Sequence, residues 1–184
     1  DWDVSNVTDM SSMFTYAQFN QNINTWDVSS VTNMYGMFLN EKVFNQPLDN
    51  WNVSSVTTME RMFASYGRGD AMVFNQNIGT WNVANVTDMS YMFANSNTSG
   101  GGSAGHAFNN GGVDSIKNWD VSNVTNFSYM FGHGSRTYFN QPLTGWDLSS
   151  ATNVTAMFTT SSFNNDVTGW VLPTSLVSLF RYSS

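Results

Sequence analysis

The fold of this chain is decided by the stretch Trp81–Phe93, which reads W-N-V-A-N-V-T-D-M-S-Y-M-F. Variants of this pattern recur along the 184 residues, and the interval from the tryptophan to the last phenylalanine is 12 in the first six copies. The copies open at Trp2, Trp26, Trp51, Trp81, Trp119, Trp146 and Trp170. A period of about 24 residues is typical of a solenoid, in which each unit buries its apolar face against its neighbours.

Two segments of each unit carry structural signals. The first reads I/L-x-x-W-x-V, the apolar spacing of a leucine-rich repeat, and its alternation predicts a short strand in a parallel sheet. The second, M-x-x-M-F, places apolar residues at i, i+3 and i+4, which predicts short helical turns. We therefore predict an α/β solenoid, leucine-rich-repeat-like, with a parallel β-sheet on the concave face and helical turns on the convex face. It has about seven repeats of 24–38 residues.

A Phe-Asn pair completes each of the first six coils. Stacked phenylalanines are expected to fill the core, and stacked asparagines to satisfy backbone groups of the turn. The pairs are Phe19-Asn20, Phe44-Asn45, Phe74-Asn75, Phe108-Asn109, Phe139-Asn140 and Phe163-Asn164. We expect one solenoid domain over residues 1–184, with an atypical C-terminal cap after Trp170. The first unit lacks the Phe-Asn half that should precede it, so we expect a fragment of a larger protein.

Composition narrows the classes of function. Only 10% of residues are charged and the net charge is −7, with two lysines and four arginines scattered over different repeats. Nucleic-acid binding needs a clustered basic surface, so we expect no nucleic-acid partner. The absence of cysteine excludes disulfides and thiolate metal sites. No apolar run approaches the roughly 20 residues of a membrane-spanning helix, so this segment is not expected to insert into a membrane.

Taken together, the W-D-V-S-N-V-T, M-F and F-N-Q strings resemble the BspA-like leucine-rich repeats. They are most similar to the mycoplasma-lipoprotein-type variant, a domain of unknown function, and the resemblance covers Trp2 to Trp170 in six copies. It implies a secreted or surface-displayed protein, in some cases an adhesin, and no enzymatic activity. It implies no particular ligand-binding residues.

The residue between the inward-facing Trp and Val should point outward, because side chains alternate along a strand. Stacked coils would align these residues as a polar strip on the concave face: Asp3, Asp27, Asn52, Asn82, Asp120 and Asp147. Such a strip is a candidate site for a sugar or a peptide, and neighbouring carboxylates are candidate Ca²⁺ ligands, although no cofactor is required. The alternative is a solvated face whose side chains serve the fold.

Several other motifs have a simpler interpretation. Arg68-Gly69-Asp70 is an integrin-type tripeptide in an inserted loop, but three-residue matches are common by chance. The threonine row (Thr8, Thr32, Thr57, Thr87, Thr125 and Thr152) is reminiscent of ice-binding solenoids, and helix capping explains the same residues. The two histidines, His106 and His133, lie in Gly-rich loops and would need a third ligand to hold a metal. We expect neither a catalytic nor a metal site.

These observations favour an extracellular or cell-surface adhesion or recognition module that binds a glycan or a protein. The expected partner is a glycan or surface protein of a host or a neighbouring cell. The alternative is a structural spacer or a filament subunit, built by stacking repeats and able to self-associate through an open N-terminal edge.

Overall fold

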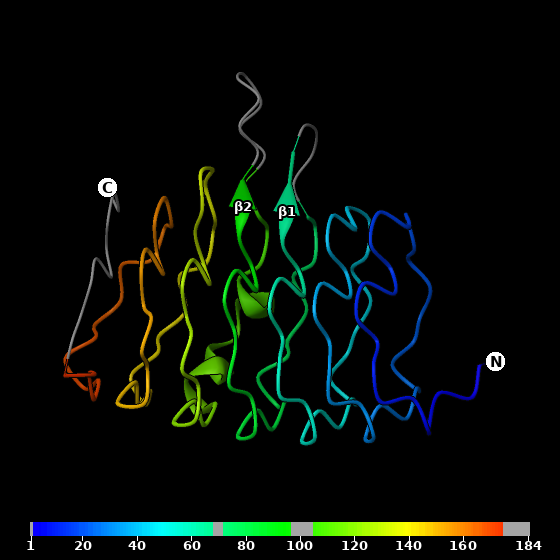
Figure 1. Cartoon of the computed structure of the whole chain (residues 1–184). Coiled ribbons are helices and arrows are strands. Elements are labelled where there is room, and N and C mark those ends of the chain that lie inside the picture. Colours follow the sequence, from blue (N-terminus) through cyan, green and yellow to red (C-terminus); the bar gives the residue numbers. More distant parts are fainter. Residues whose placement is uncertain (1, 68–71, 97–104, 175–184) are drawn as a thin grey trace.

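The computed structural model describes residues 2–67, 72–96 and 105–174. Each of the first six repeat units forms one coil, and successive coils lie side by side along the molecule (Figure 1). Two short strands, β1 (Ser65–Tyr66) and β2 (Asn95–Ser96), pair in parallel. Two 3₁₀ helices, η1 (Asn110–Gly112) and η2 (Asp114–Asn118), fill the insertion between Phe108 and Trp119. None of the helices in the described part of the chain is long and apolar enough to cross a membrane.

One row of parallel bridges between coils runs through the residue that follows the repeat threonine of each unit. Parallel bridges there link Asp9, Asn33, Thr58, Asp88, Asn126 and Asn153 in succession. The threonines next to these bridges also bond from coil to coil. The backbone N–H and the hydroxyl of Thr57 both donate to the carbonyl of Thr32, at 2.9 and 3.1 Å. The predicted helix-capping role of these threonines is therefore wrong, because their hydroxyls bond the neighbouring coil instead.

The predicted helical turns at M-x-x-M-F are replaced by hydrogen-bonded turns that alternate between two kinds of partner. Met92 N–H donates to Met89 of its own coil, whereas the N–H groups of Tyr91 and Phe93 donate to the next coil at 2.9 Å. Tyr91 has φ 57°, the left-handed region, and this conformation interrupts a helix. The i, i+3, i+4 spacing thus brings the methionines and phenylalanine inward through a turn.

The predicted strands around Trp and Val are also largely absent from the described residues, where the segment forms a single bridge, Asp147↔Val171. The reason is that turns use the backbone groups on both sides: Trp81 N–H donates to Ile78, and Val86 N–H donates to Val83. The Trp81 indole N–H then donates to the carbonyl of Leu48 in the preceding coil at 2.8 Å. The leucine-rich-repeat class of the whole chain remains a prediction.

The aromatic core predicted from the repeat is confirmed. Phe93 stacks between Phe63 and Phe131 of the neighbouring coils, with ring centroids 5.7 and 5.6 Å away. Phe108 of the second aromatic row packs against Phe93 at 3.8 Å. All four rings are buried. Close-packed stacked rings of this kind bury large apolar areas and fix the register of adjacent coils.

The predicted asparagine ladder is confirmed as well. The side-chain oxygen of Asn45 accepts the N–H of Asn75 at 2.9 Å, and the oxygen of Asn75 accepts the N–H of Asn109 at 2.7 Å. Each rung satisfies a backbone donor in the turn, so the row joins consecutive coils along the outside of the aromatic core.

Candidate recognition site

The predicted polar strip is engaged mainly in local turns. In each of its six members the side-chain Oδ1 accepts the backbone N–H two residues on, and in Asp3, Asp27 and Asp120 it also accepts a serine hydroxyl. The Ser29 hydroxyl and backbone N–H together lower the pKa of Asp27. These contacts give the strip a structural role, and ligand binding by it remains a prediction.

The other predicted site residues are separated by the structure or lie outside it. Arg68-Gly69-Asp70 falls outside the described residues. His106 is fully buried, whereas His133 is half-buried among surface tyrosines, so the two histidines have different surroundings. Within the described ranges, no group of three or more His, Cys, Asp or Glu residues is arranged to hold a metal ion.

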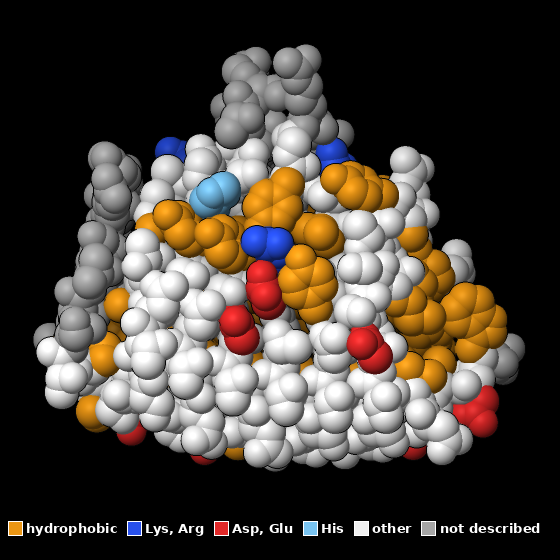
Figure 2. All heavy atoms as spheres, in the orientation of Figure 1, with side chains coloured by type: hydrophobic (Ala, Val, Ile, Leu, Met, Phe, Trp, Pro, Cys, Tyr) orange, Lys and Arg blue, Asp and Glu red, His pale blue; other side chains and the backbone are white. Residues whose placement is uncertain are grey.

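A different group of side chains gathers on one face of the middle coils. We call it the tyrosine cluster, and Figure 2 shows a surface group of orange side chains, the class that includes tyrosine, around a basic side chain and beside a histidine. Its members are Tyr35, Glu60, Arg61, Tyr66, Tyr91, Tyr129 and His133.

The repeat positions its core members. Two residues stand between the apolar positions of the M-x-x-M segment, which reads F-x-x-M in the fifth unit, and the second of them is left-handed in successive coils. Arg61, Tyr91 and Tyr129 occupy this second position with φ 56°, 57° and 57°. Because each coil places it at the same point, the three side chains align over neighbouring coils.

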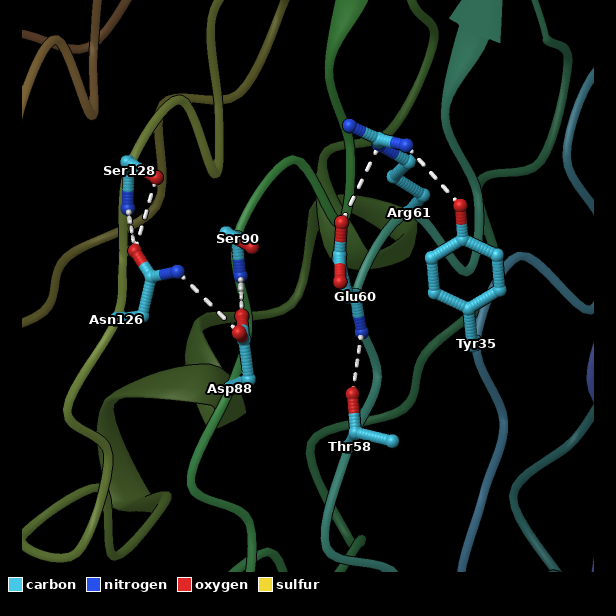
Figure 3. A network of polar contacts seen from close by, with 8 residues as sticks. All are labelled: Tyr35, Thr58, Glu60, Arg61, Asp88, Ser90, Asn126 and Ser128. Atoms are coloured by element: carbon cyan, nitrogen blue, oxygen red, sulfur yellow. Dashed lines mark hydrogen bonds and ion pairs between the residues drawn. The ribbon is translucent and has the colours of Figure 1, made fainter.

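Arg61 is the centre of the cluster. Its guanidinium carbon lies 5.2 Å from the ring centroid of Tyr91, and 5.9 and 6.0 Å from those of Tyr66 and Tyr35. One terminal nitrogen donates to the Tyr35 hydroxyl at 3.0 Å, and Nε lies 3.4 Å from a Glu60 oxygen (Figure 3). Burial alone would lower the pKa of Arg61, but the Tyr35 hydrogen bond and the surrounding phenols and carboxylate raise it, so the cation is held.

Carboxylates line one side of Arg61. The backbone N–H of Glu60 donates to the Thr58 hydroxyl at 3.3 Å, and Asp88 accepts from the Asn126 amide and the Ser90 backbone (Figure 3). Burial raises the pKa of Glu60; the charge of Arg61 opposes this and that of Asp88 reinforces it. Arg61 and Glu60 therefore form a half-buried ion pair with little net charge.

His133 closes the other side. Its ring packs edge-on against Tyr129, Tyr91 and Tyr66, with centroids 5.0, 5.5 and 6.1 Å away, while Tyr91 and Tyr129 stack at 4.9 Å. Its Nδ1 is buried and has no hydrogen-bond partner among the described residues. Burial, assisted by the charge of Arg61, lowers the pKa of His133, which favours the neutral ring at neutral pH.

A depression of about 390 Å³ lies between Arg61, Tyr66, Tyr91 and His133. It offers guanidinium and imidazole nitrogens beside aromatic surfaces, a combination suited to holding a small polar group. The apolar pattern of the repeat does not single out this site, because the two residues between the methionines vary from unit to unit. Aligning those positions unit by unit would have shown Arg61, Tyr91 and Tyr129 in one column.

The fold and this site define a repeat protein with stacked coils and an aromatic surface cluster. The chain belongs to the family described as "Mycoplasma protein of unknown function, DUF285", which matches residues 1–102 and 103–181. No curated protein and no solved structure matches the chain.

Proposed function

We propose that this domain is a recognition module displayed outside the cell, or on its surface, that binds a glycan or a protein through the tyrosine cluster. The proposal involves no catalysis, in line with the resemblance to BspA-like leucine-rich repeats. It is carried by one observation: three bulky side chains, Arg61, Tyr91 and Tyr129, occupy consecutive left-handed positions on one face.

The left-handed conformation disfavours residues with a Cβ, by about 1–2 kcal/mol each. Glycine meets the same backbone requirement without that strain, as Gly36 does at φ 54°. Large side chains at this position are therefore not needed to form the coil. Tyrosine and arginine are also the residues most enriched where proteins bind partners, since each combines a broad contact surface with a polar end.

The surroundings of the cluster support binding without rearrangement. The rings rest on coils joined by backbone hydrogen bonds and stacked phenylalanines, so their positions are fixed before a ligand arrives. A preorganised surface loses less entropy on binding than a flexible one.

The test is binding of the labelled domain to a panel of glycans and extracellular proteins, compared with two double variants. Tyr91→Gly with Tyr129→Gly removes both rings and keeps the left-handed backbone, and we expect it to abolish binding. Asn52→Lys with Asn82→Lys alters the polar strip and should leave binding intact. Loss of binding only in the second variant would show that the ligand binds to the polar strip. If the wild-type domain binds nothing on the panel, that result would count against a recognition function.

A second candidate, a spacer or fibre subunit that self-associates, is favoured by one specific observation. The first described coil exposes 66% of Trp2, 67% of Tyr16 and 36% of Met13. Exposed apolar groups of this size favour association with a matching surface. Sedimentation over a range of concentrations, with Trp2→Ser and Tyr16→Ser as the comparison, tests this alternative: growth in mass that these changes abolish supports it, and a constant monomer mass argues against it.

A further inference from the structure

We infer that the depression in the tyrosine cluster binds one sugar residue of an uncharged glycan. This rests on the proposed recognition function and narrows its ligand. Three features of the depression support this choice: its mixture of donors and acceptors, its local charge, and its size.

The polar groups suit a ligand that both donates and accepts. A sugar hydroxyl does both, whereas an anion only accepts and an ammonium group only donates. Arg61 supplies N–H donors in the lining of the depression, and the acceptor oxygens of the Glu60 carboxylate lie beside the lining, 3.4 Å from Arg61. His133 also lines the depression, and its buried Nδ1 has no hydrogen-bond partner in the described part of the chain. Charge-assisted hydrogen bonds from such a pair are stronger than those between neutral groups.

The charge of the site disfavours ionic ligands. The positive charge of Arg61 is balanced by Glu60, and Asp88 lies close enough to Glu60 to raise its pKa. The chain as a whole carries a net charge of −7. The negative net charge of the chain would repel an acidic glycan. A cationic ligand would be repelled by Arg61, whose guanidinium already lies against the three tyrosine rings.

The size of the depression favours a sugar over a protein surface. Its volume of about 390 Å³ lies at the small end of ligand pockets, and four side chains line it. A stable protein partner usually covers about 800 Å² on each side, or roughly 20–30 residues, whereas four side chains line this depression. The aromatic rings beside the polar groups provide apolar surface for the C–H faces of a sugar ring.

The experiment compares neutral, sialylated and sulfated glycans and a set of extracellular proteins, at about 50 mM and about 500 mM NaCl, conditions that separate screened from unscreened binding. We expect binding to neutral glycans alone, with affinity nearly independent of salt and competition by the free methyl glycoside. Tyr91→Gly should weaken it by about tenfold or more, the range of a contact at the centre of a binding surface. The matched control is Ser12→Gly, the same change at the same repeat position in another coil, which should bind like the wild type.

The outcomes separate the two proposals. Binding to an acidic glycan or to a protein that Tyr91→Gly abolishes would overturn the neutral-sugar inference and leave the recognition function standing. Neutral-glycan binding that Tyr91→Gly leaves unchanged would remove the cluster from both proposals, and so would the absence of all binding. Thermal unfolding of each variant excludes loss of fold as the cause of a lost signal.

Discussion

One position of the repeat differs sharply between the outer and the middle coils. In the outer coils it holds Ser12, Gly36 and Ala156, with φ 56°, 54° and 54°. In the middle coils it holds the three bulky residues of the tyrosine cluster, with φ between 56° and 57°. The backbone conformation is therefore set by hydrogen bonds between coils and does not depend on the side chain. This independence allows one column of the surface to vary while the coils remain alike.

The column rests on the aromatic core, which we expect to be packed more tightly in the middle coils than at the end of the stack, and Phe93→Ala tests the middle. Phe93 is buried against the rings of Phe63, Phe108 and Phe131. Truncation leaves a cavity in a close-packed stack, so we expect a loss of about 3–5 kcal/mol in the free energy of unfolding. Chemical denaturation followed by tryptophan fluorescence measures it.

Phe163→Ala is the comparison at the end of the stack, because Phe163, of the Phe-Asn row, lies in the last aromatic pair and is only partly buried. We expect a clearly smaller loss there, since fewer contacts disappear. Equal losses at the two sites would mean that packing is as tight at the end of the stack as in its middle.

A second difference is that both histidines lie in the middle coils. We expect one of them, His106, to make the stability of the protein depend on pH. His106 is fully buried: Nε2 lies 2.7 Å from the carbonyl of Phe63, and Nδ1 accepts the N–H of Phe108. The Nδ1 contact requires the neutral ring, because a protonated Nδ1 cannot accept a hydrogen bond. Burial lowers the pKa of His106 to about 4, although the hydrogen bond from Nε2 to the Phe63 carbonyl opposes this shift. Between pH of about 6.5 and about 4 the unfolded chain binds one more proton than the folded chain.

We therefore expect the free energy of unfolding to fall by roughly 3 kcal/mol as the pH drops through that window, and to be unaffected by this group above it. Denaturation midpoints at several pH values, for the wild type and for His106→Gln, measure the effect. The variant lacks the titrating ring, so its curve should be flatter. Parallel curves would show that His106 does not control the acid sensitivity.

The part of this architecture that could be predicted from sequence is the part with a fixed side-chain role. The tryptophan and the M-F phenylalanine keep one spacing in the first six units, and the Phe-Asn pair keeps one spacing to the next tryptophan in all but one. Each makes the same contact in successive coils, as Asn45 and Asn75 do. Their periodicity therefore predicted the stacked rings and the asparagine ladder. The assignment to leucine-rich repeats goes further than these contacts and stays a prediction.

The part that could not be predicted depends on where backbone hydrogen bonds go. The spacing of Met89, Met92 and Phe93 fits a helical turn as well as the observed turn, and only the bonds of Tyr91 and Phe93 to the next coil distinguish them. The tyrosine cluster follows from that choice, because it is the left-handed turn that directs Arg61, Tyr91 and Tyr129 to one face. A pattern of apolar residues specifies neither the partners of the backbone hydrogen bonds nor the direction of the side chains between the methionines.

The finest test of the comparison replaces the left-handed residues themselves. Ser12→Gly relieves about 1–2 kcal/mol of backbone strain and adds about 0.5–1 kcal/mol of chain entropy to the unfolded state, so we expect a gain of about 0.5 kcal/mol. Tyr91→Gly relieves the same strain but loses the stack on Tyr129 and the contact with Arg61, about 0.5–1.5 and about 0.5–1 kcal/mol. Its stability should stay within about 1 kcal/mol of the wild type, measured by the same denaturation, while its binding falls. A much larger loss of stability in Tyr91→Gly would mean that the side chains at this position hold the coils together. The bulky residues of the middle coils would then be explained by stability, and the proposal that they serve binding would fail.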